Sequence, residues 1–198
     1  MSARDEILSR IRAALADRPT TPPIPREYRL AGMRPADVDL FAERVADYQA
    51  TVYRRASRDV ASAIATLVGE RRVVIPDGFP TEWLPPDLDA AREPLTTIDL
   101  DHADGTITTC ALAIADTGTV ILDGGPGQGR RALSLVPDYL LVVVRAAQVR
   151  AGVPDAIAEL DPTRPQTWIS GPSATSDIEL NRVEGVHGPR SLDLVLVS

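Results

Sequence analysis

Short apolar segments, several of them without alternation of polar and apolar residues, are the feature that most restricts the fold of this chain. Seven such segments, bounded by proline, glycine or aspartate, follow one another: RRVVIP, LTTIDL, ALAIAD, TGTVIL, YLLVVVR, TWIS and LDLVLVS. A strand that is apolar on both sides is covered on both faces of its sheet, as is typical of parallel strands. The sequence therefore predicts these segments as strands, with parallel pairs at the centre of the sheet.

Helical periodicity precedes and interrupts these strands. Before the first strand, ADVDLFAERVADYQATVYRRAS and RDVASAIATLVGER each place apolar residues on one helical face. The first face consists of Val38, Phe41, Val45, Tyr48 and Val52, and the second of Val60, Ile64 and Leu67. Later helices are expected in AAQVRAGVPDAIAEL, interrupted near Gly152, and from about Ala174 to Val183. This order predicts an open, largely parallel α/β sheet with flanking helices, whose ligands bind beyond the carboxyl ends of the strands.

The amino-terminal part of the chain has a different character. A helix is expected from Ser2, a suitable N-cap, to about Ala16, and five prolines follow up to Pro35. The apolar stripe of this helix consists of Ile7, Ile11, Ala14 and Leu15. We expect a helix and proline-rich linker over residues 1–35, called the arm below, and an α/β domain over residues 36–198. So narrow a stripe predicts that the arm packs poorly on its own domain or docks onto a partner.

The residue types that are missing exclude several kinds of chemistry. All 21 basic residues are arginines, so Schiff-base chemistry on lysine and a P-loop lysine are excluded. Cys110 is the only cysteine, and His102 and His187 are the only histidines. The chain by itself cannot ligate an iron–sulfur cluster, build a cysteine-based zinc site or form an internal disulfide. We expect no metal site and no bound cofactor.

Charge and hydropathy favour a cytoplasmic protein over a nucleic-acid-binding, secreted or membrane-spanning one. The net charge of -7 argues against nucleic-acid binding, which requires a basic surface. No apolar run approaches the ~20 residues that cross a bilayer. The amino terminus is too densely charged for a signal peptide. We therefore expect a cytoplasmic protein without a membrane span.

Residues 169–197, ISGPSATSDIELNRVEGVHGPRSLDLVLV, collect most of the candidate site residues. Ser173, Thr175 or Ser176 can cap the start of the expected helix, where backbone amides attract an anion. His187 and Arg190 come near the same edge of the sheet if the final two strands are neighbours. Each feature alone also has an ordinary explanation: a helix cap, a structural histidine and a solvated arginine. Together they favour a site for a small anionic metabolite, with His187 as the catalytic base.

The glycine-rich segment DGGPGQGRR is open to two interpretations. Gly125, Gly127 and Gly129 are spaced two apart, which matches neither the dinucleotide fingerprint nor a P-loop. One interpretation is a mobile connection between strands. The other is a flap whose Arg130 and Arg131 grip a carboxylate or phosphate, which makes Arg130 a second ligand-binding candidate after Arg190.

Three segments resemble the LUD-domain family, which is typified by lactate-utilisation protein C. They are IADTGTVIL, RALSLVPDYLLVVV and residues 169–197, and the likeness runs from about Arg72 to the carboxyl terminus. The resemblance implies a fold like that of the NagB/RpiA/CoA-transferase group. It also implies participation in oxidising L-lactate to pyruvate, together with an iron–sulfur LUD-type protein and a second lactate-utilisation subunit.

The resemblance also singles out Asp116 as a catalytic candidate. This residue stands before Thr117 and Gly118, at a position where the family usually has glutamate. In related CoA-transferases a glutamate acts chemically. Aspartate is shorter by a methylene group, and this departure argues against covalent catalysis here.

Two functions of different class stay open at this point. The first is a subunit, catalytic or not, of a lactate-oxidising system. The second is a free-standing transferase or hydrolase that acts on a small anionic metabolite, phosphorylated or linked to coenzyme A. The sequence does not decide whether the chain is itself an enzyme.

Overall fold

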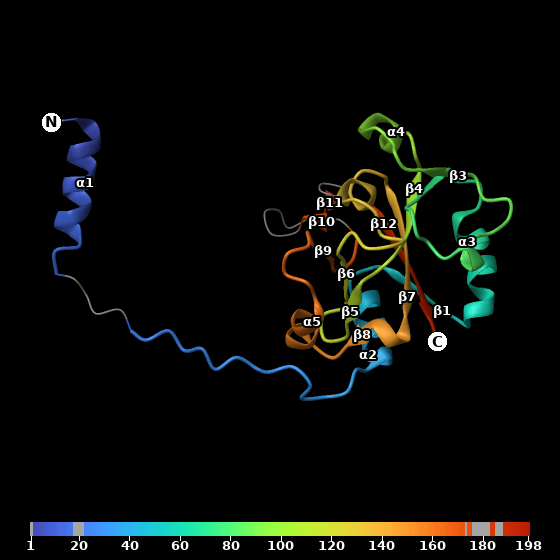
Figure 1. Cartoon of the computed structure of the whole chain (residues 1–198), viewed down its shortest axis with the longest axis horizontal. Coiled ribbons are helices and arrows are strands. Elements are labelled where there is room, and N and C mark those ends of the chain that lie inside the picture. The colour runs from blue at the N-terminus through green and yellow to red at the C-terminus, as the bar shows by residue number, and fades with distance from the viewer. Residues whose placement is uncertain (1, 18–21, 173, 176–182, 185–187) are drawn as a thin grey trace.

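A six-stranded sheet forms the centre of the protein (Figure 1). The computed structural model describes residues 2–17, 22–172, 174–175, 183–184 and 188–198. The strand order is β1-β12-β7-β4-β2-β3, and every neighbouring pair is parallel. The strands are β1 (Thr51–Arg55), β2 (Val73–Ile75), β3 (Ala90–Arg92), β4 (Gly105–Thr109), β7 (Tyr139–Arg145) and β12 (Ser191–Val197). The expected open, parallel α/β sheet is confirmed.

Helices cover both faces of this sheet. Helix α2 (Val38–Asp47) buries Phe41 and Val45 against one face, and α3 (Val60–Val68) buries Ile64 against the other. Successive residues of β7 alternate between the two hydrophobic cores: Leu140, Val142 and Val144 belong to the first, and Leu141 and Val143 to the second. Because neighbouring side chains of a strand point to opposite faces, an unbroken apolar run needs cover on both sides.

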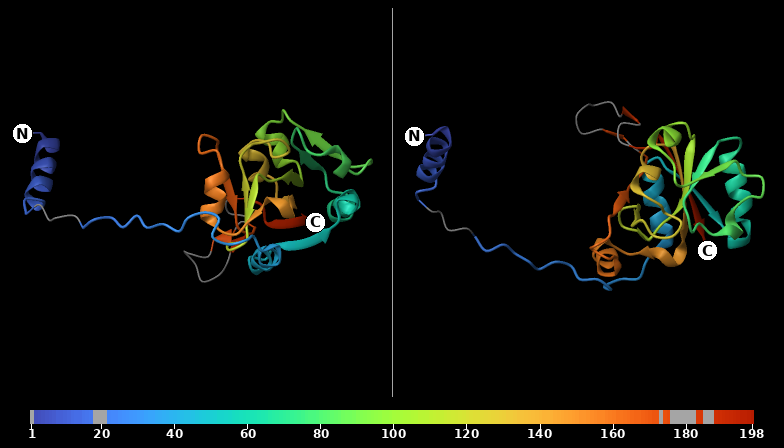
Figure 2. Two further views of the ribbon diagram at one scale, coloured as in Figure 1. Left: turned by 60° about the horizontal axis from the view of Figure 1, so that its bottom comes forward. Right: turned by 45° about the horizontal axis from the view of Figure 1, so that its top comes forward.

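A smaller four-stranded sheet, ordered β8-β5-β6-β9, shares the core on the α2 face. Its strands are β5 (Leu112–Ile114), β6 (Thr119–Leu122), β8 (Val149–Arg150) and β9 (Thr167–Ile169). Helix α5 (Val153–Glu159) packs on its other face through Ala156. Figure 2 shows α5 and α3 on opposite sides of the domain. The sequence placed His187 and Arg190 at one edge on the condition that the final two strands are neighbours, and this condition is not met, because β9 pairs with β6 and β12 lies in the large sheet.

Short elements complete the chain. The 3-10 turns are η1 (Ser57–Asp59), η2 (Thr81–Trp83), η3 (Arg131–Ser134) and η4 (Ala146–Gln148). Strand β10 (Ala174–Thr175) pairs antiparallel with β11 (Val183–Glu184). The helix expected from about Ala174 to Val183 is therefore wrong at both ends, and residues 176–182 lie outside the described residues.

The segment LTTIDL forms a helix, α4 (Thr97–Asp101), where a strand was expected. Thr96 and Asp99 explain the difference because they form a capping box. The Asp99 N–H donates to Thr96 Oγ1 at 3.1 Å, and the Thr96 N–H donates to Asp99 Oδ2 at 2.8 Å. Reciprocal capping satisfies two amides that a helix start otherwise leaves unpaired. Leu100 then enters the core from a helix instead of a strand.

The central strand β4, with the sequence GTITT, was missed because its threonines look like loop residues. All five residues are buried. The Thr106 hydroxyl donates to the carbonyl of Leu133 at 2.7 Å, and the Thr108 hydroxyl donates to that of Gly127 at 3.0 Å. Threonine fits a strand because it is β-branched, and these bonds remove the penalty for burying its hydroxyl.

The helical face expected to continue to Val52 also ends earlier. Helix α2 stops at Asp47, and Gln49 has a φ of 67°, which reverses the chain. Val52 therefore lies in β1, which pairs with β12 at one edge of the large sheet. The periodicity of the segment continued across a turn that no glycine or proline marked.

The arm begins with helix α1 (Ala3–Ala14), as expected. Its capping box is formed by Ser2 and Asp5, whose N–H donates to the Ser2 hydroxyl at 3.3 Å. None of its residues is buried, and Figure 1 shows the helix apart from the α/β domain. Helix α1 is thus well capped but has no packing partner within the described part of this chain.

We expect the amides of α1 to exchange with solvent quickly in the monomeric protein. A helix of 12 residues without tertiary packing is marginal in water. Hydrogen exchange at a concentration where sedimentation shows a monomer measures this, with the buried helix α3 as the slow reference. Slow exchange throughout residues 3–15 in such a monomer would contradict the expectation.

Candidate functional site

The turn between β5 and β6 holds Asp116 in a defined place. Its N–H donates to the carbonyl of Ala151 at 3.1 Å. Gly118 has a φ of +58°, and a Cβ there would lie 2.6 Å from the carbonyl carbon of Arg44 in α2. Only glycine combines this backbone conformation with so close an approach. The turn is therefore pressed onto α2, and this contact orients the Asp116 side chain.

A chain of hydroxyl groups joins this turn to the end of β9. The hydroxyls of Thr117 and Thr119 are 2.7 Å apart, and that of Thr119 is 2.8 Å from the Ser170 hydroxyl. Gly171 follows directly and packs on Tyr48, next to the end of α2. The segment expected to bind a ligand therefore begins beside the Asp116 turn.

Two arginines near the carboxyl end of the arm contact the Asp116 carboxylate. Arg34 forms an ion pair and hydrogen bond with Oδ2, and an Arg29 nitrogen lies 3.6 Å from the same oxygen. The Asp116 side chain is 24% exposed, so water screens these contacts only in part. Gly152 leaves room for the group, since a Cβ there would lie 3.0 Å from Oδ2. We call Asp116, Arg29 and Arg34 the Asp116 cluster.

A cavity of about 440 Å³ adjoins Arg34. Its lining consists of Ala31, Gly32, Arg34, Ala36, Arg150, Ala151, Asp155, Ala158 and Glu159. Within it, Arg150 pairs with both carboxylate oxygens of Glu159, at 2.5 and 2.6 Å. This pairing lowers the pKa of Glu159 and raises the pKa of Arg150. The guanidinium of Arg150 is therefore already paired within the protein. Arg34 is the other arginine that lines this cavity, and it also belongs to the Asp116 cluster.

Asp155 attaches residues 29–34 to helix α5. The Gly32 N–H donates to Asp155 Oδ1 at 2.5 Å, and the Gly152 N–H donates to Oδ2 at 2.9 Å. These bonds, the one from Gly32 first, lower the pKa of Asp155 below its ordinary value of 3.8. The residues that carry Arg29 and Arg34 are therefore held by a backbone contact as well as by charge.

Acidification should release this attachment. The folded-state pKa of Asp155 is lowered, so the contact contributes stability above its unfolded pKa of 3.8 and loses it as the pH falls through the lowered value. An NMR titration that follows the Gly32 amide should report a midpoint below 3.8. In Asp155→Asn, the same resonance should lose this titration. A midpoint at the ordinary value would contradict the contact.

The predicted site residues of the last segment are only partly described. Ser173, Ser176 and His187 lie outside the described residues. Thr175 lies in β10, so the expected helix start that would attract an anion does not occur there. Ala174 pairs with Glu184 in the two-stranded sheet of β10 and β11, and the grouping of Ser173, Ser176 and His187 in one site stays a prediction.

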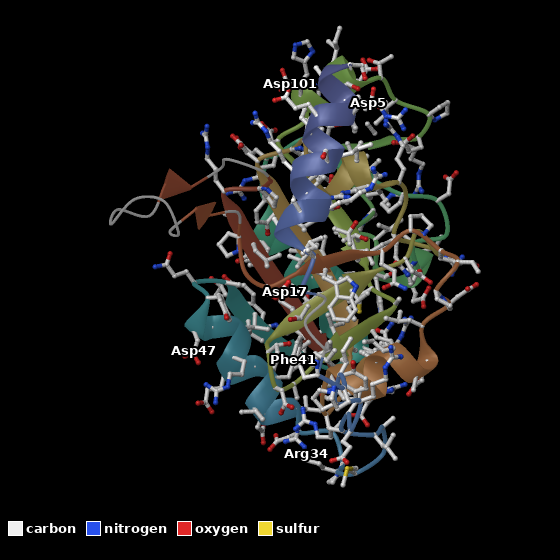
Figure 3. The ribbon with its side chains drawn as sticks, turned by 90° about the vertical axis from the view of Figure 1, so that its left-hand side faces the viewer. Asp5, Asp17, Arg34, Phe41, Asp47 and Asp101 are labelled. Carbon is white, nitrogen blue, oxygen red and sulfur yellow. The ribbon has the colours of Figure 1, made fainter. Side chains whose placement is uncertain are left out.

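Arg190 lies elsewhere, at the amino end of β12. It pairs with Asp138 at 3.4 Å and is exposed. It lines a second cavity, of about 590 Å³, together with Asp101, His102 and others. Figure 3 shows Asp101 and Arg34 at opposite ends of the molecule. The structure therefore does not bring Arg190 together with the Asp116 cluster.

Arg130 is engaged at a third place. Its Nε lies 3.1 and 3.2 Å from the two oxygens of Glu93, and its Nη2 donates to the carbonyl of Leu95 at 2.6 Å. The preceding glycine segment is anchored at the end of β4, where the Thr109 N–H donates to the carbonyl of Gly127 at 2.8 Å. The glycine segment is thus held at Gly127 and at Arg130, and its mobility stays a prediction.

Sequence reasoning missed Arg29, Arg34 and Ser170. Ser170 lies in a segment that resembles the LUD-domain family, and this resemblance could have identified it. No sequence pattern could have identified Arg34, because it meets Asp116 across 82 positions.

Within the described ranges, His, Cys, Asp and Glu side chains form no group of three or more that could hold a metal ion. No helix among these residues is long and apolar enough to span a bilayer.

The fold and the charged turn define the class of this protein as a parallel α/β domain with an ionic cluster beside its second sheet. The family model of the LUD domain matches residues 80–197. The chain belongs to the LUD-domain family, which confirms the resemblance seen in the sequence.

Similar proteins and structures agree with this assignment. A protein named lactate utilization protein C from Deinococcus radiodurans is 46% identical over 204 residues, which cover 98% of this chain and 95% of that protein. One of the same name from Halalkalibacterium halodurans is 35% identical over 97 residues, covering 45% of this chain and 42% of that protein. The crystal structure of a DUF162 family protein from Deinococcus radiodurans matches with a TM-score of 0.70 and 40% identity, over 81% of this chain and 96% of that chain.

Proposed function

We propose that this chain is a cytoplasmic subunit of a system that oxidises L-lactate to pyruvate. The supporting observation is its 46% identity, over 98% of its length, to a protein named lactate utilization protein C. Similarity over nearly the whole of both chains includes the arm, the Asp116 turn and the last segment. This favours a shared role over a shared fold alone.

The proposed reaction requires a partner that accepts electrons. Oxidation of lactate to pyruvate breaks the C2–H bond and releases two electrons and two protons. Cys110 is the only cysteine, is 3% exposed, and burial raises its pKa to about 12. A single inert thiol cannot carry these electrons. In the proposal they pass to an iron–sulfur LUD-type protein, and a second lactate-utilisation subunit completes the system.

Within this chain, the Asp116 cluster is the proposed place for the carboxylate of the metabolite. A guanidinium has five N–H donors, so Arg34 can hold Asp116 and a ligand carboxylate together, assisted by Arg29. The cavity of about 440 Å³ beside Arg34 is of the size that small ligands occupy. Asp116 or His187 then accepts the hydroxyl proton of lactate. Ser173, Thr175 and Ser176 remain proposed hydrogen-bonding groups, because their segment starts beside this turn.

Calorimetry with L-lactate, pyruvate and phosphate tests the binding site. Loss of a charge-assisted pair is worth ~1.5–3 kcal/mol, so Arg34→Ala should weaken carboxylate binding by roughly 10- to 150-fold. Arg190→Ala is the matched control, because it removes an exposed arginine that lines the other cavity, together with Asp101. Arg130→Ala is a second control. Lost affinity in Arg190→Ala with unchanged affinity in Arg34→Ala would move the site to the amino edge of the sheet.

Complementation tests the function itself. A bacterium that lacks its own lactate utilization protein C should regain growth on L-lactate with this chain, but not with Asp116→Asn or His187→Ala if these residues accept the proton. Each variant is first shown to be folded by circular dichroism. Failure of the wild-type chain, together with turnover of a phosphorylated or CoA-linked metabolite by the isolated protein, would instead establish the transferase or hydrolase alternative.

A further inference from the structure

Helix α1 presents an apolar stripe to solvent. Ile7, Ile11 and Leu15 are 58%, 49% and 58% exposed. They follow one another at intervals of four residues, so they form one row roughly 12 Å long on the helix. The capping box fixes where this helix begins. A row of this kind on a well-capped helix is the shape that fits an apolar groove.

The domain has a partly apolar groove on the outer face of the small sheet. It has a volume of about 290 Å³ and is lined by Ile157, Leu160, Pro162, Arg164 and Gln166. We call it the α5 groove. Ile157 is 59% exposed on helix α5, so an apolar side chain of this groove still faces water.

Trp168 of β9 extends this apolar surface. Its Nε1 donates to Oε1 of Gln166, a lining residue, at 3.1 Å, and the side chain is 40% exposed. Trp168 pairs across the strands with Ile121, which packs with Ala156 of α5. Paired residues of neighbouring strands point to the same face, so Trp168 and α5 lie on one side of the small sheet. Helix α5 is too short, at seven residues, to cover that face alone.

Charge also favours a contact between the arm and the domain. Residues 1–36 contain seven arginines and four acidic residues, a net charge of +3. Residues 37–198 contain 14 arginines and 24 acidic residues, a net charge of −10. The arm and the acidic domain therefore attract each other, and the excess positive charge lies in residues 18–36, because residues 2–17 contain three arginines and three acidic residues.

The linker decides which domain α1 reaches. Its base is fixed near the start of α5, where the Gly32 N–H donates to Asp155. Between Leu15 and Arg29 lie 13 residues, four of them proline. Proline-rich chain is a semi-rigid spacer that extends ~3.1 Å per residue, so this linker spans roughly 40 Å and resists the reversal needed to return to its own α5. A second molecule lies within reach without such a reversal.

We propose that α1 of one chain docks in the α5 groove of a second copy of this chain, and that the exchange is reciprocal. Ile7, Ile11 and Leu15 pack against Ile157, Leu160 and Trp168 of the other copy. Two identical contacts close a two-fold dimer and leave no unfilled groove, which is the usual symmetry of a homodimer. This inference does not depend on the proposed function.

Disulfide trapping distinguishes the second copy from other occupants. Cys110 is buried, so an added cysteine is the only accessible thiol among the described residues. Ile11→Cys and Ile157→Cys are prepared as separate full-length proteins of different mass, mixed and oxidised mildly. The expected product is a cross-linked species that contains one chain of each kind. The pair Ile11→Cys and Ile98→Cys is the matched control, because Ile98 is 68% exposed on α4, away from the groove, and should give no such product.

Sedimentation equilibrium supplies the second measurement. The wild-type chain should be a dimer whose dissociation constant rises at least 100-fold in Ile11→Glu and in Ile157→Glu, but not in Ile98→Glu. A double variant with cysteines at 11 and 157 that forms an internal disulfide as a monomer would overturn the proposal in favour of the chain's own groove. It is also overturned by a wild-type chain that stays monomeric, or by a dimer that Ile11→Glu leaves intact.

Discussion

Replacing Gly118 by alanine should lower the free energy of unfolding by ~2–4 kcal/mol. Gly118 has a φ of +58°, where a side chain is strained, and a Cβ would lie 2.6 Å from the carbonyl carbon of Arg44 and 2.7 Å from the nitrogen of Val45. These atoms belong to the backbone of α2 and cannot move aside as a flexible side chain would. The turn or the helix must therefore shift, and Asp116 shifts with the turn. Urea unfolding measures the loss.

Gly124→Ala is the matched control for this substitution. Gly124 has a similar φ of +72°, but the nearest atom to its Cβ would be the Gly129 oxygen at 3.7 Å, an ordinary contact. Only the backbone strain remains, so its expected loss is ~1 kcal/mol. Equal losses in the two variants would show that the close approach of the Asp116 turn to α2 is unimportant. Carboxylate binding should also weaken in Gly118→Ala alone.

Replacing Trp83 by alanine should cost ~3–5 kcal/mol of folding stability. The side chain is 2% exposed and meets Phe79 edge-on, with ring centroids 6.3 Å apart. The Arg145 guanidinium lies 4.3 Å from the ring centroid, and Nε1 donates to the Ser57 hydroxyl at 3.2 Å. Removal of the ring leaves a cavity beside the large sheet and takes a hydrogen-bond donor from Ser57.

The other tryptophan of the chain, Trp168, is the natural comparison. Its side chain is 40% exposed on β9, so Trp168→Ala should cost only about 1 kcal/mol or less in the monomer. Both variants are followed by circular dichroism during denaturation, because the substitutions themselves change the fluorescence. A loss in Trp168→Ala as large as that in Trp83→Ala would contradict the assignment of Trp83 to the core.

The large sheet was predictable because burial leaves a local trace in the sequence. YLLVVVR and LDLVLVS became β7 and β12, whose residues are almost all buried. The capping box at Ser2 and the start of α5 after Gly152 were likewise visible in neighbouring residues, whereas the part before Gly152, expected to be helical, forms η4 and strand β8. The missing lysines and the single cysteine excluded whole classes of chemistry, since composition does not depend on the fold.

Other elements depended on partners far along the chain. The threonines of β4 became core residues because the carbonyls of Leu133 and Gly127 accept from their hydroxyls. No pattern within GTITT predicts that these two carbonyl groups will lie beside its threonines. Tertiary context decides whether a short polar or ambiguous segment is buried, and such context overrides local preference.

The sequence by itself determined the α/β class, the main parallel strands, the capped arm helix and the interest of Asp116. Only the tertiary structure decided what surrounds Asp116. Arg34 reaches it across 82 positions, and Ser170 meets Thr119 because β9 pairs with β6. Arg190 was predicted to act with Ser173, Ser176 and His187, and the structure pairs it with Asp138 at the amino end of β12, away from Asp116. Helices and strands follow periods of a few residues, whereas a site is assembled by strand pairing and ion pairs between distant segments.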